Sequence, residues 1–233
     1  MSRGPTVRCR GLGRVYRQGE VEVPALRDVD LEVAAGEFLC LSGPSGSGKT
    51  TLLNLVGGLD RPTSGEVEVV GRRLNDLSNT ALARLRLRHL GFVFQAYNLI
   101  PVLSARENVE FVLQLQGMGT AARRERALAL LAEVGLAELA ERRPAELSGG
   151  QQQRVAVARA LVSHPELVLA DEPTANLDSA SAERLMRLLR RMNREHGVTF
   201  IFSTHDPRVM EHAHRLLGLR DGRIVEDRRL GAG

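Results

Sequence analysis

The chain has 233 residues, of which 43% are hydrophobic and 26% are charged, the balance of a globular protein that can bury a full core. No apolar run approaches the roughly 20 residues of a membrane-spanning helix, and residues 1–10 lack the apolar segment of a secretory signal. The net charge is +4, but the arginines are interleaved with glutamates and only 3% of residues are aromatic, so no nucleic-acid partner is expected.

The N-terminal third is rich in strand-forming residues. Strands are predicted over 7–16 and 29–33, and a further strand over 66–70 follows the turn at 62–65. These strands should form a small antiparallel sheet. The cysteines Cys9 and Cys40 lie in apolar, strand-like surroundings, which favours free thiols in a reducing compartment over a disulfide.

A glycine-rich loop lies between a predicted strand and a predicted helix in residues 37–51, EFLCLSGPSGSGKTT. The apolar run 38–41 is typical of a strand buried in a parallel sheet. The helix continues from the loop and ends at Gly57 and Gly58. This order of strand, loop and helix is what the phosphate-loop motif G-x-x-x-x-G-K-[ST] requires. The predicted binding residues are Gly43, Pro44, Ser45, Gly46, Ser47, Gly48, Lys49, Thr50 and Thr51.

The residue types of this loop suit a nucleotide such as ATP. Glycines let backbone N–H groups converge on an anion, and the helix N-terminus adds unpaired donors. Lys49 is expected to reach the β- and γ-phosphates, and the Thr50 hydroxyl to ligate Mg²⁺. Lys49 is also the only lysine among 32 basic residues, which suggests that this position requires a compact ammonium group.

Helical periodicity dominates from about residue 96 to residue 146. Ser104 and Glu107 form a capping box for a helix that ends near Gly117. A second helix is predicted over 120–134, closed by Gly135.

A second candidate anion site follows at residues 147–151, LSGGQ. Ser148 is a good N-cap, and Gly149 and Gly150 leave N–H groups bare at a helix start. The helix should end at 164–165, His-Pro. An ordinary capped helix is the alternative interpretation of this segment.

An apolar strand predicted over 167–170 ends in Asp171 and Glu172. An acid at this position is the usual Mg²⁺-associated carboxylate of phosphate-loop proteins. Glu172 is then the natural general base for a water that attacks the γ-phosphate. Two solvated acids in a turn are the alternative, although the strand before them has no polar residue.

The remaining chain predicts a helix with Leu185 and Leu189 on its apolar face, ended by Gly197. A strand over 198–202 follows, and a hairpin joins 216–219 to 224–225 across an Asp-Gly turn.

The phosphate loop, LSGGQ and the Asp171–Glu172 pair occur in the order typical of the ATP-binding-cassette (ABC) ATPases, and the sequence resembles this family along nearly its whole length. The resemblance implies that Tyr16 lies against adenine and that His205 contacts the γ-phosphate. It also implies that Gln95 touches Mg²⁺ and senses a membrane partner.

The same resemblance assigns the remaining roles. Catalysis would rest on Lys49, Glu172 and His205, and Mg²⁺ would be held by Thr50, Gln95 and Asp171. Two chains would pair head to tail on ATP binding. The LSGGQ segment of one chain would then cap the nucleotide of the other through Ser148, Gly149, Gly150 and Gln151, and the loop with Asp178 would connect the two sites.

The expected fold is therefore an α/β phosphate-loop NTPase: a RecA-like core with an N-terminal antiparallel β subdomain and an inserted α-helical signature subdomain. We expect one ABC ATP-binding domain over 1–233, with the helical subdomain at about 96–165. Transport would then require a separate, permease-like integral membrane subunit, with this chain bound at the cytoplasmic face of the bacterial inner membrane.

Residues 92–109, FVFQAYNLIPVLSARENV, resemble the branch of the family that serves lipoprotein release and macrolide export, often called the LolD/MacB type. A regulatory ABC ATPase that acts on cell-wall hydrolases through a membrane partner is the alternative. A DNA-repair or ribosomal ABC ATPase is disfavoured, because those relatives usually carry a long coiled coil or two cassettes in one chain.

Overall fold

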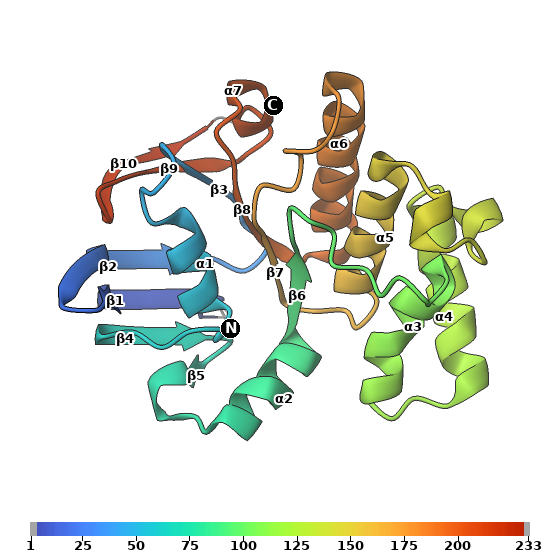
Figure 1. Ribbon diagram of the computed structural model, residues 1–233, viewed down its shortest axis with the longest axis horizontal. Helices are drawn as coiled ribbons and strands as arrows, with labels where there is room; N and C mark the ends of the chain where they lie inside the picture. The colour runs from blue at the N-terminus through green and yellow to red at the C-terminus, as the bar shows by residue number, and fades with distance from the viewer. Residues whose placement is uncertain (1–3, 231–233) are drawn as a thin grey trace.

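The computed structural model describes residues 4–230, which form two β-sheets and a lobe of helices (Figure 1). The N-terminal sheet is antiparallel, with strand order β2-β1-β4-β5. Its strands are β1 (Val7–Gln18), β2 (Val21–Val33), β4 (Ser64–Val69) and β5 (Arg72–Arg73). The predicted antiparallel sheet is confirmed. However, β2 begins well before the expected residue 29, because it pairs with β1 along its whole length.

The second sheet has the order β10-β9-β3-β8-β7-β6. Its strands are β3 (Phe38–Ser42), β6 (Leu90–Val93), β7 (Leu167–Ala170), β8 (Thr199–Ser203), β9 (Arg215–Arg220) and β10 (Arg223–Arg229). The first five of these are parallel to one another, and β10 pairs with β9 as the antiparallel arm of the predicted hairpin. Every residue of β3, β7 and β8 is buried, as continuous apolar runs in a parallel sheet require.

Short loops and seven α-helices connect the strands of the described chain. The helices are α1 (Lys49–Val56), α2 (Asn79–His89), α3 (Ala105–Leu115), α4 (Thr120–Glu133), α5 (Gly149–Leu161), α6 (Ser179–His196) and α7 (Pro207–Met210). The capping box of Ser104 and Glu107 is present at the start of α3. Sequence reasoning missed α2 and α7. The signal for α2 was Ser78, whose hydroxyl accepts a hydrogen bond from the Ala81 N–H at 3.2 Å.

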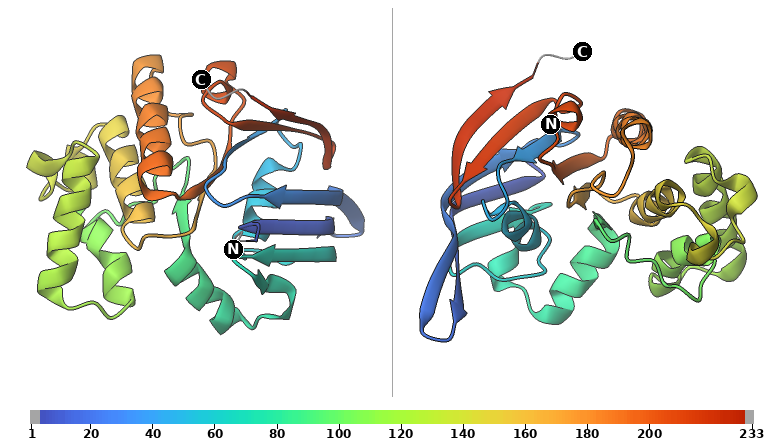
Figure 2. Two further views of the ribbon diagram at one scale, coloured as in Figure 1. Left: turned by 180° about the vertical axis from the view of Figure 1, so that it is seen from behind. Right: turned by 45° about the horizontal axis from the view of Figure 1, so that its top comes forward.

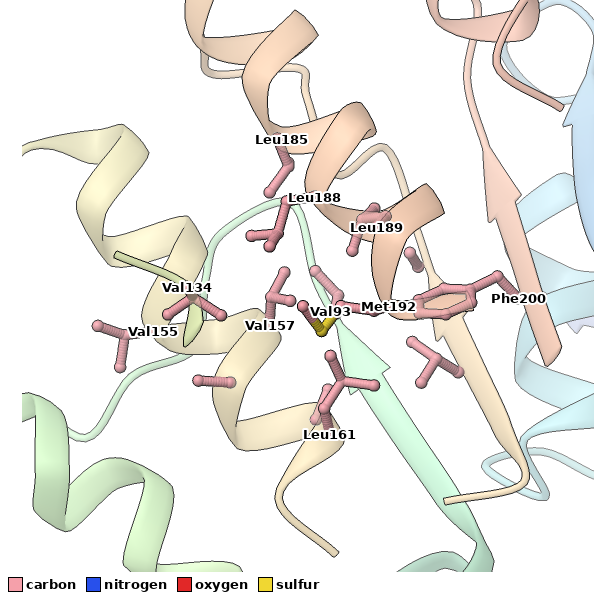
Figure 3. Close-up of a cluster of buried hydrophobic side chains, with 14 of the residues drawn as sticks. Val93, Val134, Val155, Val157, Leu161, Leu185, Leu188, Leu189, Met192 and Phe200 are labelled. Carbon is pink, nitrogen blue, oxygen red and sulfur yellow. The ribbon is translucent and has the colours of Figure 1, made fainter. Parts of the chain in front are cut away.

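The helices α3, α4 and α5 lie together on the side of the main sheet away from the antiparallel sheet (Figures 1 and 2). Among these helices and α6, valines and leucines form a continuous core that reaches Phe200 of β8 (Figure 3). Met192 and Phe200 are fully buried in it. Within residues 4–230, no helix combines the length and the apolar character needed to cross a bilayer.

Candidate nucleotide-binding site

The glycine loop between β3 and α1 surrounds part of a cavity of about 690 Å³. Gly43 and Gly48 have φ angles of +142° and +106°, which side chains other than glycine rarely adopt. A Cβ at Gly43 would lie 2.2 Å from the Leu219 carbonyl oxygen, and one at Gly48 would lie 2.6 Å from that of Ala25. Both positions therefore require glycine.

The predicted site residues that line this cavity come from four separate parts of the chain. They are Ser45, Gly46, Ser47, Gly48, Lys49, Thr50, Thr51, Gln95, Asp171, Glu172 and His205. Ala25 and Ala175, which sequence reasoning did not select, also line it.

The Ser47 hydroxyl and the N–H groups at the start of α1 are donors that an anion can engage. No acidic residue lies in the first turn of α1, and the N–H groups of that turn have no partner within the helix. The Ser47 hydroxyl oxygen is buried, and in the described part of the chain it has no hydrogen-bond partner. These unmatched donors suit the oxygens of a polyphosphate.

Lys49 is the cation of the loop, and its side chain is buried. Its Nζ donates to the carbonyl oxygens of Gly43 at 2.7 Å and Pro44 at 3.0 Å. Among residues 4–230, no carboxylate forms an ion pair with it. A buried ammonium without an anion is available for a phosphate group.

A chain of polar contacts joins the ends of β7 and β8 to α1. The Thr50 hydroxyl donates to Asp171 Oδ2 at 2.8 Å, and the Ser203 hydroxyl donates to Asp171 Oδ1 at 2.6 Å. Ser203 Oγ also accepts the Glu172 N–H at 2.8 Å. Ser203, which sequence reasoning did not select, therefore fixes both acids from the neighbouring strand.

Glu172 has the unusual φ angle of +46°, and its carboxylate lies 3.0 Å from Nδ1 of His205. The two side chains differ in exposure, with 18% for Glu172 and 72% for His205. A partly buried carboxylate beside an exposed imidazole, both facing the cavity, can accept a proton there.

The side-chain oxygens of Thr50, Asp171 and Gln95 are the kind of ligand that Mg²⁺ prefers, and all three residues line the cavity. The Thr50–Asp171 hydrogen bond already brings two of these donors together. The residues present therefore fit a Mg²⁺ ion that accompanies the phosphates.

Tyr16 does not line the cavity. Its hydroxyl donates to Asp60 at 2.9 Å, and the guanidinium carbon of Arg14 lies 4.6 Å from its ring centroid. Its role as an adenine-stacking residue stays a prediction.

The LSGGQ segment begins α5 with a capping box, in which Ser148 and Gln151 satisfy each other's backbone N–H groups. Asp178 caps α6 in the same region, and hydrogen bonds from the Ser181 hydroxyl and N–H lower the pKa of its carboxyl. Ser148, Gly149, Gly150, Gln151 and Asp178 do not line the phosphate cavity of their own chain. Ser148 and Gly150 instead border a separate hollow of about 300 Å³.

The parallel sheet, the glycine loop at its edge and the acids at the ends of β7 define a phosphate-loop nucleotide-binding protein. The family described as "ABC transporter" matches residues 26–175, more than half of the chain, and the chain belongs to this family.

Two kinds of curated relatives are similar to the chain. The lipoprotein-releasing system ATP-binding protein LolD of Anaeromyxobacter dehalogenans is 51% identical over 98% of this chain and 97% of its own length. The macrolide export ATP-binding/permease protein MacB of Syntrophobacter fumaroxidans is 50% identical over 94% of this chain. The chain spans only 31% of the length of that MacB protein.

The fold is similar to that of solved ATP-binding cassettes. A dimeric post-hydrolysis state of the cassette MJ0796 bound to ADP and Pi has a TM-score of 0.90 and 43% identity, over 97% of this chain and 100% of that one. The predicted fold class and the resemblance to the LolD/MacB branch are therefore confirmed. The similarity to LolD and MacB does not favour the regulatory alternative.

Proposed function

We propose that the chain binds ATP with Mg²⁺ in the cavity beside the glycine loop and hydrolyses it to ADP and phosphate. The observation that carries this proposal is that Asp171, Glu172 and His205 line the same cavity as Lys49. The loop amides and Lys49 hold the phosphates, and His205 contacts the γ-phosphate.

The hydrolytic step uses groups that this chain supplies. Glu172 accepts a proton from the attacking water, and its rotation is limited because Ser203 and His205 hold its backbone and its carboxylate. Mg²⁺, held by Thr50, Gln95 and Asp171, would neutralise charge on the phosphates.

We further propose that two copies pair head to tail when ATP binds. The support is the position of Ser148, Gly149 and Gly150 at the start of α5, outside the phosphate cavity of their own chain. A second copy, turned end for end, would bring them to its partner's γ-phosphate. The dimeric state of the similar MJ0796 cassette agrees with this arrangement.

We propose that ATP hydrolysis drives a conformational change in a separate, permease-like membrane subunit. This chain would be bound peripherally at the cytoplasmic face of the bacterial inner membrane. The support is the similarity to LolD and MacB, whose names specify lipoprotein release and macrolide export.

The Glu172→Gln variant tests the ATPase and the partner together. It should bind ATP with wild-type affinity, release phosphate at least about 100-fold more slowly, and form a long-lived dimer. Phosphate release near the wild-type rate would exclude Glu172 as the base.

The resemblance to the LolD/MacB branch implies a partner with four membrane-spanning helices and a large extracytoplasmic domain, and the same variant, trapped with ATP in native membranes, should co-purify such a protein. A six-helix permease would move the chain to another transport branch. Recovery of no membrane protein would remove the transport proposal and leave the ATPase.

A further inference from the structure

The segment from Gln95 to Ser104 connects β6 to α3 without a helix or strand of its own. Tyr97 and Asn98 are consecutive left-handed residues in it, with φ angles of +58° and +49°. Such a conformation is unfavourable for residues other than glycine, so contacts from outside the segment must maintain it.

Arg159 of α5 supplies one set of these contacts. Its guanidinium donates to the Tyr97 carbonyl oxygen at 2.8 Å and also to the Asn98 carbonyl oxygen. Burial lowers the pKa of this guanidinium, and among residues 4–230 no carboxylate forms an ion pair with it. A desolvated cation whose hydrogen bonds all go to one short segment is suited to fix the shape of that segment.

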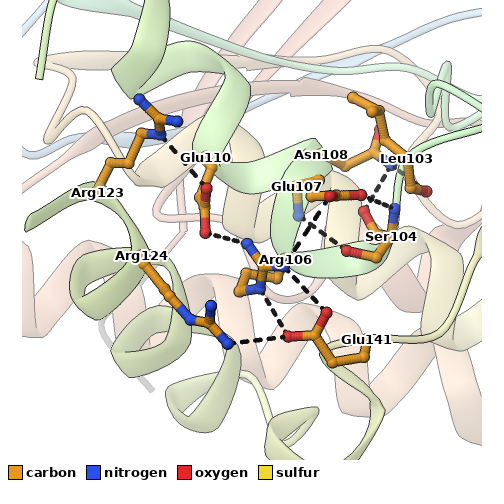
Figure 4. A network of polar contacts seen from close by, with 9 residues as sticks. All are labelled: Leu103, Ser104, Arg106, Glu107, Asn108, Glu110, Arg123, Arg124 and Glu141. Carbon is orange, nitrogen blue, oxygen red and sulfur yellow. Dashed lines mark hydrogen bonds and ion pairs between the residues drawn. The ribbon is translucent and has the colours of Figure 1, made fainter. Parts of the chain in front are cut away.

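Asn108 of α3 holds the other end of the segment and is fully buried (Figure 4). Its side chain accepts the Ile100 N–H at 2.7 Å and donates to the carbonyl oxygens of Ile100, Leu103 and Ser104. Both anchors thus belong to the helical lobe, whereas Gln95 at the start of the segment lines the phosphate cavity.

The Tyr97 side chain extends the connection to the signature. A Cβ placed on Gly149 would lie 2.9 Å from the Tyr97 hydroxyl oxygen, so this hydroxyl occupies the space that the glycine leaves free. The Gln95 carbonyl oxygen accepts a hydrogen bond from Asn176 at 2.9 Å, in the loop before Asp178. Tyr97 therefore connects Gln95, which lines this chain's phosphate cavity, to the LSGGQ segment, which is proposed to cap the partner's nucleotide.

We propose that Arg159 and Tyr97 are positioning residues for ATP hydrolysis, which hold Gln95 at the phosphate cavity and fix it relative to Gly149 of the signature. The inference rests on the proposed ATPase function and on the trans role of the signature. A shift of α5 would move Gln95 with it, because the guanidinium and the tyrosine ring join the two.

The first test is Arg159→Gln, with Arg126→Gln as the matched control. Arg126 is a half-buried arginine of the same lobe whose pKa is also lowered by burial, and it makes no hydrogen bond to residues 95–104 of the described chain. For Arg159→Gln, a fluorescent ATP analogue should bind the monomer within about twofold of wild type, whereas kcat falls about tenfold. The Mg²⁺ concentration for half-maximal rate should rise about tenfold, because Gln95 is displaced. The control should leave the Mg²⁺ dependence unchanged, and an unchanged Mg²⁺ dependence in Arg159→Gln would overturn the proposal.

A double-variant comparison separates positioning from a purely structural effect. If Arg159 acts through Gln95, adding Arg159→Gln to Gln95→Ala should lower kcat by less than about twofold. A full tenfold further loss would contradict the proposal. Arg159→Lys keeps the positive charge with a single ammonium group, so its Mg²⁺ requirement should lie between those of wild type and Arg159→Gln. This variant replaces Arg159→Gln in the test if Arg159→Gln does not fold.

Tyr97 is tested in the Glu172→Gln background by the fraction of dimer formed with ATP. Tyr97→Ala should reduce that fraction about tenfold at unchanged ATP affinity of the monomer, and Tyr97→Phe, which keeps the ring but lacks the hydroxyl beside Gly149, should restore only part of it. Equal dimer formation in Tyr97→Ala would refute the role of Tyr97. Absence of the dimer in Glu172→Gln itself would instead refute the proposed function, so the two failures are distinct.

Discussion

Replacing Lys49 by methionine tests the assignment of the phosphate loop, because methionine keeps the length and apolar stem of the side chain but removes the ammonium. The ammonium now donates two hydrogen bonds to carbonyl oxygens in a buried position. In the complex it would donate to phosphate oxygens instead. A hydrogen bond to a charged group contributes about 1.5–3 kcal/mol, so two such bonds correspond to at least about 3 kcal/mol. At 1.4 kcal/mol per factor of ten, the ATP affinity should fall by about 100-fold or more.

The unliganded protein should respond differently to the same change. Lys49→Met leaves two carbonyl oxygens without donors but also removes a buried charge without a carboxylate partner, so the free energy of unfolding should change by no more than about 1 kcal/mol. Titration calorimetry measures the ATP affinity, and urea unfolding measures the stability. Lys49→Arg is the control for charge, and it should also bind weakly because the planar guanidinium does not replace a compact ammonium. An ATP affinity of Lys49→Met within threefold of wild type would refute the assignment.

Three further predictions concern the rest of the molecule. Burial raises the pKa of Cys9 to about 12 and that of Cys40 still further, so at pH 8 neither thiol should react with iodoacetamide until the protein is unfolded. Labelling followed by mass spectrometry checks this prediction, and rapid labelling of the native protein would contradict it. Asn108→Ala should lower the free energy of unfolding in urea by about 2–4 kcal/mol, because it leaves the Ile100 N–H and several backbone carbonyl oxygens of residues 100–104 without partners. A decrease below about 1 kcal/mol would show that water replaces the amide. Two hydrogen bonds from Arg215 lower the pKa of Asp227, so its stabilising contribution is complete above the unfolded-state pKa of about 3.9 and is lost as the pH falls through the folded-state value. Asp227→Asn should therefore lower the melting temperature more at pH 7 than at pH 2. An equal decrease at both pH values would exclude the ion pair as its cause.

The motifs with local signals were predicted well from the sequence. The strand–loop–helix order around Lys49, the capping box at Ser104 and the strand that ends in Asp171 each depend on residues close together in the chain, and the structure contains all three elements. The early start of β2 was missed because it depends on pairing with β1, where charged and apolar residues alternate irregularly.

The contacts that orient the site were not predictable in the same way. Ser203 is more than thirty residues from Asp171 in the chain, and Arg159 is more than sixty from Tyr97, so no local pattern signals either contact. A lone serine in a strand or a lone arginine on a helix is most often structural. These side chains gain their partners only when β7 pairs in parallel with β8 and when α5 packs with the other helices of the lobe.

We propose that each ATP site is built from the glycine loop of one chain and the signature of another. Mixing two inactive variants, Lys49→Met and Ser148→Arg, tests it most directly by the rate of phosphate release from ATP. Random pairing gives mixed dimers half of the time, and each mixed dimer has one site in which both components are intact. The mixture should therefore recover up to about a quarter of the wild-type rate. If the mixture shows no more activity than the separate variants, the composite site is contradicted, and the signature would act only within its own chain.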